Sequence, residues 1–173
     1  MMNRFPLRSL RLRPGEEHRE HLSLALEPLR FGGEEYVPTP HDAPAELVVQ
    51  RAASGDVLRL RFATTLEGPC VRCLGPAGLQ VEIDAQDYEA TDSESAAELA
   101  SEYVADGELD VEAWARDQLA LGTPDQVLCR PDCAGLCPFC GKDLNIEPHE
   151  HDEQPADARW AALEALRAET TDT

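Results

Sequence analysis

The chain of 173 residues has few aromatic side chains, almost no lysine and no long hydrophobic run. Aromatic residues make up 5% of the sequence, so the core must be built mainly from Leu, Val and Ala. Lys142 is the only lysine. No apolar run approaches the roughly 20 residues of a membrane-spanning helix, and the start, MMNRFPLRSLRLRPGEEH, has no apolar signal segment. We therefore expect a soluble, cytoplasmic protein that does not contact membranes.

Motifs typical of catalysis are also missing. The sequence contains no Gly-rich phosphate loop, no GxSxG and no HExxH, and the segment HEHDE beginning at His149 does not have the HExxH spacing. The sequence therefore predicts a protein without enzymatic activity and without a small-molecule substrate.

The charge of the chain is strongly negative. There are 34 acidic and 15 basic residues, which gives a formal net charge of −19. Such a field repels phosphate backbones at a distance and attracts basic proteins. Residues 82–112 carry twelve acids and no base, and this run is interpreted either as a solvated acidic loop or as a docking surface for a basic partner. Residues 1–30 are slightly basic, with six arginines against four glutamates.

Cysteines are concentrated in one short segment. Four of them lie within twelve residues, in CRPDCAGLCPFCG, and the last pair has the CPFCG sequence of a zinc knuckle. A second CxxC occurs earlier as CVRC, and a HEH sequence follows the cluster. The candidate metal ligands are Cys70, Cys73, Cys129, Cys133, Cys137, Cys140, His149 and His151.

Several chemistries could use these cysteines. Disulfides need an oxidising compartment, which the lack of a signal segment argues against. A redox CxxC usually opens a helix after a strand, and here it is crowded by further cysteines. The Cys-x3-Cys-x2-Cys spacing also occurs in radical enzymes with an iron–sulfur cluster, but those are far larger barrels. Zinc is the preferred interpretation, because four N/S ligands in a cytosolic protein favour it.

The ligand pairing stays open in the sequence. One pairing joins Cys137 and Cys140 to the two histidines, which leaves Cys70 and Cys73 to combine with the remaining two cysteines. The alternative is a single site, made either by the four clustered cysteines or by the two CxxC knuckles. Two sites use each ligand once.

Hydrophobic periodicity predicts strands first and helices later. Alternation over residues 5–13 and 21–28 and around 47–62 predicts strands and a hairpin, and the first CxxC lies before another alternating segment at 78–83. Asp110 is an N-cap for a helix ending near Gly122, and a second helix is expected after Pro155. Trp114 and Trp160 are expected as core anchors of these helices.

These elements predict an α+β fold, with a strand-rich N-terminal sheet or barrel-like core followed by short helices and a Cys/His zinc-binding segment. The expected organisation is a β-rich core over 1–90, an acidic linker over 91–109 and a helical, zinc-knuckle part over 110–173, together forming one compact unit.

Four sequence segments, in order, resemble the YceD family of bacterial and plastid proteins. They are GPCVRCL at residues 68–74, LDVEAWARDQLAL at 109–121, Cys129 to Asn145 with the run CAGLCPFCGKDLN, and DARWAAL at 157–163. Two positions depart from the family pattern. HEH replaces a frequent Cys-x-Cys, and imidazole is also a zinc ligand. Ala158 replaces a proline before the last helix.

The resemblance implies a function in accumulation of large-subunit ribosomal RNA and in ribosome assembly, without a known catalytic activity. It also implies a small, basic ribosomal protein of the large subunit as partner, while direct contact with ribosomal RNA stays open. Zinc is the expected cofactor from the ligand types. The alternatives are an iron–sulfur or thiol-redox protein and a generic zinc-ribbon regulatory adaptor.

Overall fold

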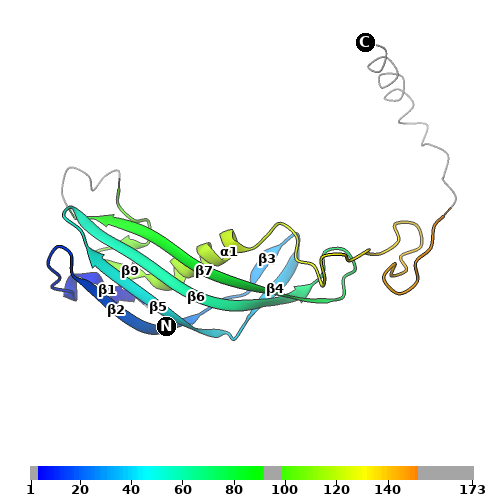
Figure 1. The fold of residues 1–173 in the computed structure, drawn as a ribbon, viewed down its shortest axis with the longest axis horizontal. Coiled ribbons are helices and arrows are strands. Elements are labelled where there is room, and N and C mark those ends of the chain that lie inside the picture. Colours follow the sequence, from blue (N-terminus) through cyan, green and yellow to red (C-terminus); the bar gives the residue numbers. More distant parts are fainter. Residues whose placement is uncertain (1–3, 92–98, 152–173) are drawn as a thin grey trace, which may run out of the picture. The chain divides into compact units, whose positions relative to one another are not determined.

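The computed structural model describes residues 4–91 and 99–151. The chain divides into two compact units, Met1–Gly135 (unit 1) and Leu136–Thr173 (unit 2). All named strands and helices belong to unit 1 (Figure 1). In chain order they are β1 (Arg4–Pro6), the 3-10 helix η1 (Leu7–Ser9), β2 (Glu17–Ala25), β3 (Leu29–Phe31), β4 (Glu34–Thr39), β5 (Asp42–Arg51), β6 (Gly55–Pro69), β7 (Pro76–Ala90), β8 (Val104–Ala105), β9 (Glu108–Asp110) and α1 (Val111–Gly122).

The long strand β6 is the centre of a six-stranded antiparallel sheet. On one side β6 pairs with β7 along its whole length, from Gly55↔Ala90 to Pro69↔Pro76. On the other side it pairs first with β5 and then with β4. β2 lies beyond β5, and β3 lies beyond β4. A separate small sheet has the order β1-β9-β8.

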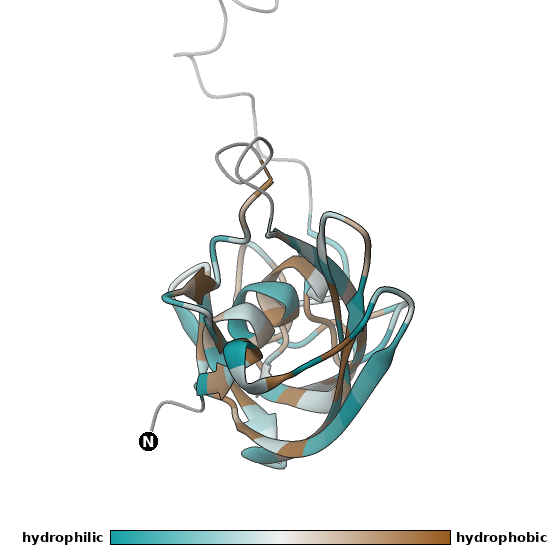
Figure 2. Ribbon diagram, turned by 90° about the vertical axis from the view of Figure 1, so that its left-hand side faces the viewer, coloured by the Kyte–Doolittle hydropathy of each residue, from teal (hydrophilic) through white to brown (hydrophobic). Residues whose placement is uncertain are grey.

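Alternation along the strands explains why the sheet has one apolar face. In β6, Leu58 and Leu60 are fully buried, whereas Arg59 between them is on the other face. Leu60 is paired with Leu47 of β5, and directly paired residues share a face. Figure 2 shows the sheet curving around α1, so the core lies between the inner face of the sheet and this helix.

Helix α1 has the boundaries expected from its sequence. The Asp110 carboxylate accepts a hydrogen bond from the Ala113 N–H at 3.0 Å, which satisfies one of the free donors of the first turn. Trp114 is 1% exposed and stacks on Tyr103, with ring centroids 6.1 Å apart. Trp114 is therefore a core anchor, as predicted. The helix ends at Gly122, where a Cβ atom would lie 2.7 Å from the Ile83 side chain.

The predicted α+β class with short helices is wrong. The structure is mostly antiparallel β, and α1 is the single α-helix in residues 4–91 and 99–151. The strands extend further than the hydrophobic periodicity indicates, because β6 and β7 each run for 15 residues and continue beyond their alternating apolar segments. The second helix, expected after Pro155 with Trp160 as its anchor, lies outside the described residues.

Other sequence predictions had mixed outcomes. The hairpin at 47–62 is confirmed as β5–β6, and the first CxxC does lie between two strands, β6 and β7. The strand predicted over 5–13 is wrong beyond Pro6, because Leu7–Ser9 form a 3-10 turn closed by the Leu10 N–H on the Leu7 carbonyl at 3.0 Å. The first part of the acidic run, residues 82–90, belongs to β7. No helix in the described part of the chain has the length and hydrophobicity of a membrane span.

Candidate metal centres

The first ligand pair lies in the turn between β6 and β7. The two strands stay paired up to Pro69 and Pro76, so the six residues between them must reverse the chain within a short loop. The Cys70 N–H donates to the Gly75 carbonyl at 2.7 Å, and the Leu74 N–H donates to the Cys70 carbonyl at 2.9 Å. Leu74 has a positive φ of 59°. This closed loop directs Cys70 and Cys73 to the same side.

The second pair comes from the segment that follows α1. The Val71 N–H donates to the Val127 carbonyl at 3.0 Å, and Arg72 Nη1 donates to the Cys133 carbonyl at 3.1 Å. Arg72 Nη2 also donates to the Gln126 side chain at 3.3 Å. These contacts hold residues 126–133 against the β6–β7 turn. Cys129 and Cys133 therefore meet a pair of cysteines more than 50 residues away in the sequence.

The four thiols of this first group have the spacing of a tetrahedral site. The sulfur atoms of Cys70 and Cys133 are 3.8 Å apart, those of Cys73 and Cys129 are 3.7 Å apart, and all four lie within 4.8 Å of one another. Four sulfurs bonded to one zinc ion at about 2.3 Å would be about 3.8 Å apart. Cys70 and Cys133 are buried, and Cys129 is exposed. The four residues fit a structural metal ion.

The pKa values of two thiols in this group, Cys70 and Cys129, are shifted in opposite directions. Burial alone would raise the pKa of the Cys70 thiol, but N–H groups of Cys73, Cys129 and Arg72 lower that pKa to about 6. Burial and the neighbouring thiols raise the pKa of Cys129 to about 12. Four thiolates this close repel one another, so full deprotonation of the group requires a cation.

The second group is built within residues 136–151 of unit 2. The Cys137 N–H donates to the Lys142 carbonyl at 2.8 Å, and the Gly141 N–H donates to the Cys137 carbonyl at 2.9 Å. Gly141 has a φ of 73°, a conformation that side chains disfavour. This is the knuckle turn that the CPFCG sequence predicts. The ligand atoms of Cys137, Cys140, His149 and His151 lie within 4.8 Å of one another.

His149 is oriented by the backbone. Its Nδ1 lies 2.7 Å from the Glu147 carbonyl, and because a carbonyl only accepts, Nδ1 carries the proton. The other nitrogen, Nε2, lies 3.1 Å from the Cys140 sulfur and is the free ligand atom. Metal-binding histidines are commonly fixed in this way. His151 packs against Phe139, with ring centroids 5.3 Å apart.

The two pKa shifts in the second group have opposite effects on metal binding, which needs a thiolate and a neutral imidazole. Burial opposes ionisation of Cys137, but N–H groups of Cys140 and Phe139, with the Cys140 and His149 side chains, lower its pKa to about 6. The hydrogen bond to the Glu147 carbonyl, with a smaller effect of Cys137, raises the pKa of His149. The group thus combines an easily ionised thiol with a basic imidazole.

All eight predicted ligands fall into these two groups. The structure brings them together as four cysteines in unit 1 and as two cysteines with two histidines in unit 2, which is the two-site pairing. The remaining histidines lie elsewhere. His21 and His41 are exposed, and His18 is partly covered by Phe5.

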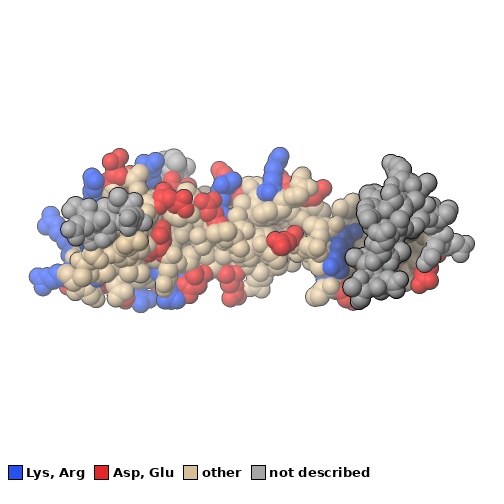
Figure 3. Space-filling view, turned by 90° about the horizontal axis from the view of Figure 1, so that it is seen from above, with Lys and Arg blue, Asp and Glu red and all other residues tan. Residues whose placement is uncertain are grey.

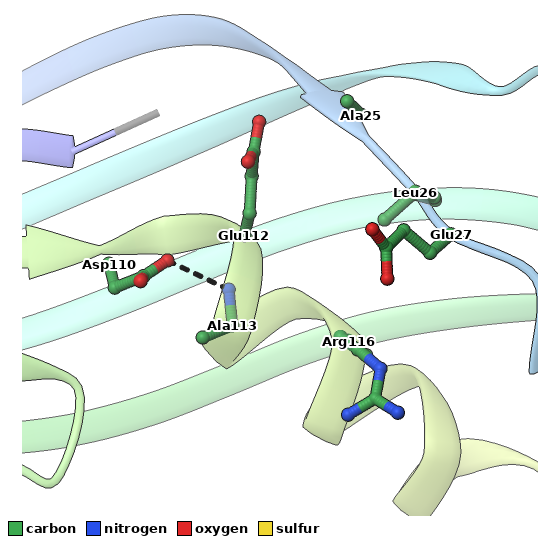
Figure 4. A pocket seen from close by; sticks show the side chains of 7 residues that line it. All are labelled: Ala25, Leu26, Glu27, Asp110, Glu112, Ala113 and Arg116. Carbon is green, nitrogen blue, oxygen red and sulfur yellow. Dashed lines mark hydrogen bonds between the residues drawn. The ribbon is translucent and has the colours of Figure 1, made fainter. Parts of the chain in front are cut away.

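One cavity was not foreseen from the sequence. It has a volume of about 210 Å³ and lies between the β2–β3 connection and the first turns of α1 (Figure 4). Glu27 and Glu112 supply carboxylates, and Leu26 and Ala113 supply apolar walls. These residues are more than 80 positions apart in the sequence, and no local pattern joins them. Only the capping role of Asp110 could be read from the sequence.

Fold and ligand groups together define a class: a small antiparallel β-sheet protein with two Cys/His groups that are positioned to hold metal ions. The family model for the large ribosomal RNA subunit accumulation protein YceD matches residues 58–167. The chain belongs to this family, as the sequence resemblance indicated.

Comparison with curated proteins gives mycobacterial relatives whose names describe them as uncharacterized proteins. A protein of Mycobacterium tuberculosis and one of Mycobacterium bovis are each 33% identical over 132 residues, covering 74% of this chain and 63% of the relative. A protein of Mycobacterium leprae is 35% identical over 147 residues, covering 79% of this chain and 65% of the relative. The chain thus spans less than two thirds of these relatives. No solved structure shows a significant match.

Proposed function

We propose that this chain is a non-enzymatic, zinc-binding factor that supports accumulation of large-subunit ribosomal RNA and assembly of the large subunit in the cytoplasm. The observation that carries the proposal is the match of the YceD family model over residues 58–167. Such a factor acts by binding rather than by chemistry, which agrees with the lack of catalytic motifs in the sequence.

The proposed role of zinc is structural. The first group has only thiols, and the second has thiols and imidazoles. These ligands suit zinc, whereas magnesium and calcium prefer oxygen ligands. Two ligands of the first group lie in residues 123–135 and all four of the second group lie in residues 136–151, two segments that contain no helix or strand. Metal bound at such sites contributes its binding free energy to folding. Zinc would therefore order these segments for contact with a partner.

The proposed partner is a basic protein of the large subunit. The net charge of −19 favours a basic partner and speeds its association. The structure also limits which acids can serve as contacts. Asp84 binds Arg59, Asp87 accepts a hydrogen bond from Ser101, and Asp110 caps α1. Glu82 and Glu102 are exposed, and Glu112 lines the cavity in Figure 4.

Depletion of the protein in its host tests the role in ribosome assembly. The expected result is a lower ratio of large-subunit to small-subunit ribosomal RNA, restored by the wild-type gene. A Cys70→Ser/Cys133→Ser variant should fail to restore it, whereas Ser9→Ala, a change at an exposed residue that belongs to neither group, should restore it. An unchanged ratio after full depletion would contradict the proposal.

Metal analysis of the purified protein tests the cofactor separately. We expect two zinc ions per chain and no visible absorption. A brown protein that contains iron and sulfide would show that the cofactor is an iron–sulfur cluster and not zinc. Six titrating thiols in a metal-free protein of unchanged stability would exclude a structural metal.

A further inference from the structure

Most basic side chains in the described residues are neutralised by neighbours. Arg59 binds Asp84, Arg61 binds Glu46 at 3.1 Å, and Lys142 binds Glu147 at 2.8 Å. The same holds for Arg4, Arg19, Arg30, Arg51, Arg116 and Arg130. Arg72 is engaged by the Cys133 carbonyl and Gln126. In a chain with more than twice as many acids as bases, this pairing is expected.

Three exposed arginines differ from the others. Arg8, Arg11 and Arg13 make no ion pair with a carboxylate in residues 4–91 and 99–151. We call them the arginine surface. All three side chains are exposed, and they come from one short segment between β1 and β2. A run of cations without counter-ions in an acidic chain is available to bind an external anion.

Local geometry turns two of these arginines outward together. Leu10 and Leu12 pack against the core, so Arg11 and Arg13, which alternate with them, face solvent. In an extended chain residues i and i+2 lie on one side, about 6.7 Å apart. The Glu16 N–H donates to the Arg13 carbonyl at 2.9 Å, and the Gly15 N–H donates to the Arg51 carbonyl at 2.8 Å. These bonds fix the segment to the end of β5.

Arg8 is held at the same end of unit 1. Its N–H donates to the Gly107 carbonyl at 3.3 Å, and its side chain covers Gly107, where a Cβ atom would collide with it. Arg8 and Arg51 line one cavity of about 330 Å³ together with the acids Asp56 and Glu89. Figure 3 shows basic side chains projecting from this end of unit 1, and because the only lysine is in unit 2 they are arginines.

Nearby carboxylates are already occupied. Glu16 accepts a hydrogen bond from the Arg13 N–H at 2.8 Å, Glu17 binds Arg19 at 2.9 Å, and Glu108 lies 3.7 Å from Arg4. At physiological salt, charges more than about 8 Å away are largely screened. Distant acids therefore contribute little to the potential at the arginine surface, whereas Glu16 keeps its negative charge beside Arg13 and opposes it locally.

We propose that Arg8, Arg11 and Arg13 form a binding surface for the phosphate backbone of RNA. The exposed groups here are cations without an apolar anchor between them, because Leu10 and Leu12 face the core. Protein interfaces are centred on apolar and aromatic anchors, whereas phosphate contacts need only exposed arginines and lysines. The surface lies outside residues 58–167, the part that the family model matches. It adds an RNA contact to the proposed function and does not depend on the metal groups.

Binding of the full-length, metal-loaded chain to fluorescently labelled single-stranded and double-stranded RNA tests this proposal. The variant Arg8→Gln/Arg11→Gln/Arg13→Gln removes the surface. The matched control, Arg4→Gln/Arg30→Gln/Arg116→Gln, removes the same number of charges from arginines that pair with acids. The double variant Arg11→Gln/Arg13→Gln leaves Arg8 in place on Gly107, which guards against a folding defect.

We expect the triple variant to bind RNA at least tenfold more weakly and the control to change less than threefold. For a single strand, each phosphate contact contributes about 0.7 to the slope of log K against log salt, so loss of three contacts should reduce the slope by about 2. An intact chain that does not bind either RNA, or a triple variant that binds like the wild type, would overturn the proposal. Zinc content measured on the same samples separates this result from a failure of the metal sites.

Discussion

His149 is the residue on which the second ligand group depends most clearly. Its Nδ1–H is held by the Glu147 carbonyl, which leaves Nε2 free beside Cys140. We predict that His149→Ala reduces the zinc content from two ions per chain to one, because three ligands rarely hold a structural zinc. Elemental analysis of dialysed protein measures this. His41→Ala is the control, since His41 is exposed and pairs only with Asp42. Equal zinc in both variants would show that His149 is not a ligand.

As the pH falls, zinc should dissociate from the second ligand group before it dissociates from the first. A proton on Nε2 of His149 occupies the lone pair that binds metal, and the raised pKa of this residue means that protonation begins at a higher pH than for an ordinary histidine. Zinc release followed with a chromogenic chelator should therefore show two steps as pH falls, the first absent in His149→Ala. A single step shared by both groups would contradict this prediction.

In metal-free unit 2, His149 and Cys137 should affect the pH dependence of stability in opposite directions. The raised pKa of His149 gives a contribution that is complete below the unfolded pKa of about 6.5 and is lost as pH rises through the folded pKa. The lowered pKa of Cys137 gives a contribution that is lost as pH falls through about 6, so acid alone does not order the metal-free unit.

Gly68, near the end of β6, lets the Tyr36 ring pack against the strand just before the first ligand group. A Cβ atom at Gly68 would collide with the ring of Tyr36, which is fully buried and donates its hydroxyl to the Pro69 carbonyl at 3.0 Å. Gly68→Ala should therefore lower the free energy of unfolding by about 1–3 kcal/mol and weaken zinc binding at Cys70. Gly78→Ala is the control, because its Cβ would meet Thr65 at an ordinary 3.6 Å. Urea unfolding of both variants decides the point; equal midpoints would refute it.

The Asp110 side chain can stabilise α1 through its capping hydrogen bond and through its charge, and two substitutions separate these effects. Asp110→Ala removes the hydrogen bond to the Ala113 N–H and should cost about 1 kcal/mol of stability. Asp110→Asn loses the charge and retains a capping oxygen, so its cost should be much smaller. Denaturant unfolding of the two variants measures the difference. If both lose the same stability, charge and not the cap holds the start of the helix.

Short-range patterns in the sequence were enough to predict several structural elements. The hairpin at 47–62, the cap at Asp110 and the knuckle turn at Gly141 each depend on residues close together in the sequence, and the structure has all three. The pairing of β1 with β9, Arg4↔Asp110, could not be predicted, because each strand has only three residues and no periodicity links them. The two ligand groups likewise depend on a tertiary contact, the hydrogen bond from Val71 to Val127.

At the scale of the whole molecule, several described acids of the 82–112 run make contacts within unit 1. Part of it is used inside unit 1: the Glu89 carboxylate accepts from the Ser101 N–H at 2.8 Å, Asp84 binds Arg59, and Asp110 caps α1. Replacing these acids would change the fold as well as the charge. A test of partner binding should therefore use Glu82, Glu102 and Glu112. Glu82 is exposed, Glu112 lines the cavity beside α1, and Glu102 is exposed with an interaction to the Tyr103 side chain.

We predict that Glu82→Gln/Glu102→Gln/Glu112→Gln weakens binding to a basic large-subunit ribosomal protein by about 1 kcal/mol, roughly fivefold in Kd, mainly through slower association. Exposed charges steer a basic partner from a distance, and salt screens this attraction, so the difference should shrink as ionic strength rises. The control, Glu34→Gln/Glu35→Gln/Asp42→Asn, removes three exposed charges elsewhere in unit 1. Surface plasmon resonance at two salt concentrations gives both rates. If the two variants are slowed equally, net charge alone acts and residues 82–112 have no special role.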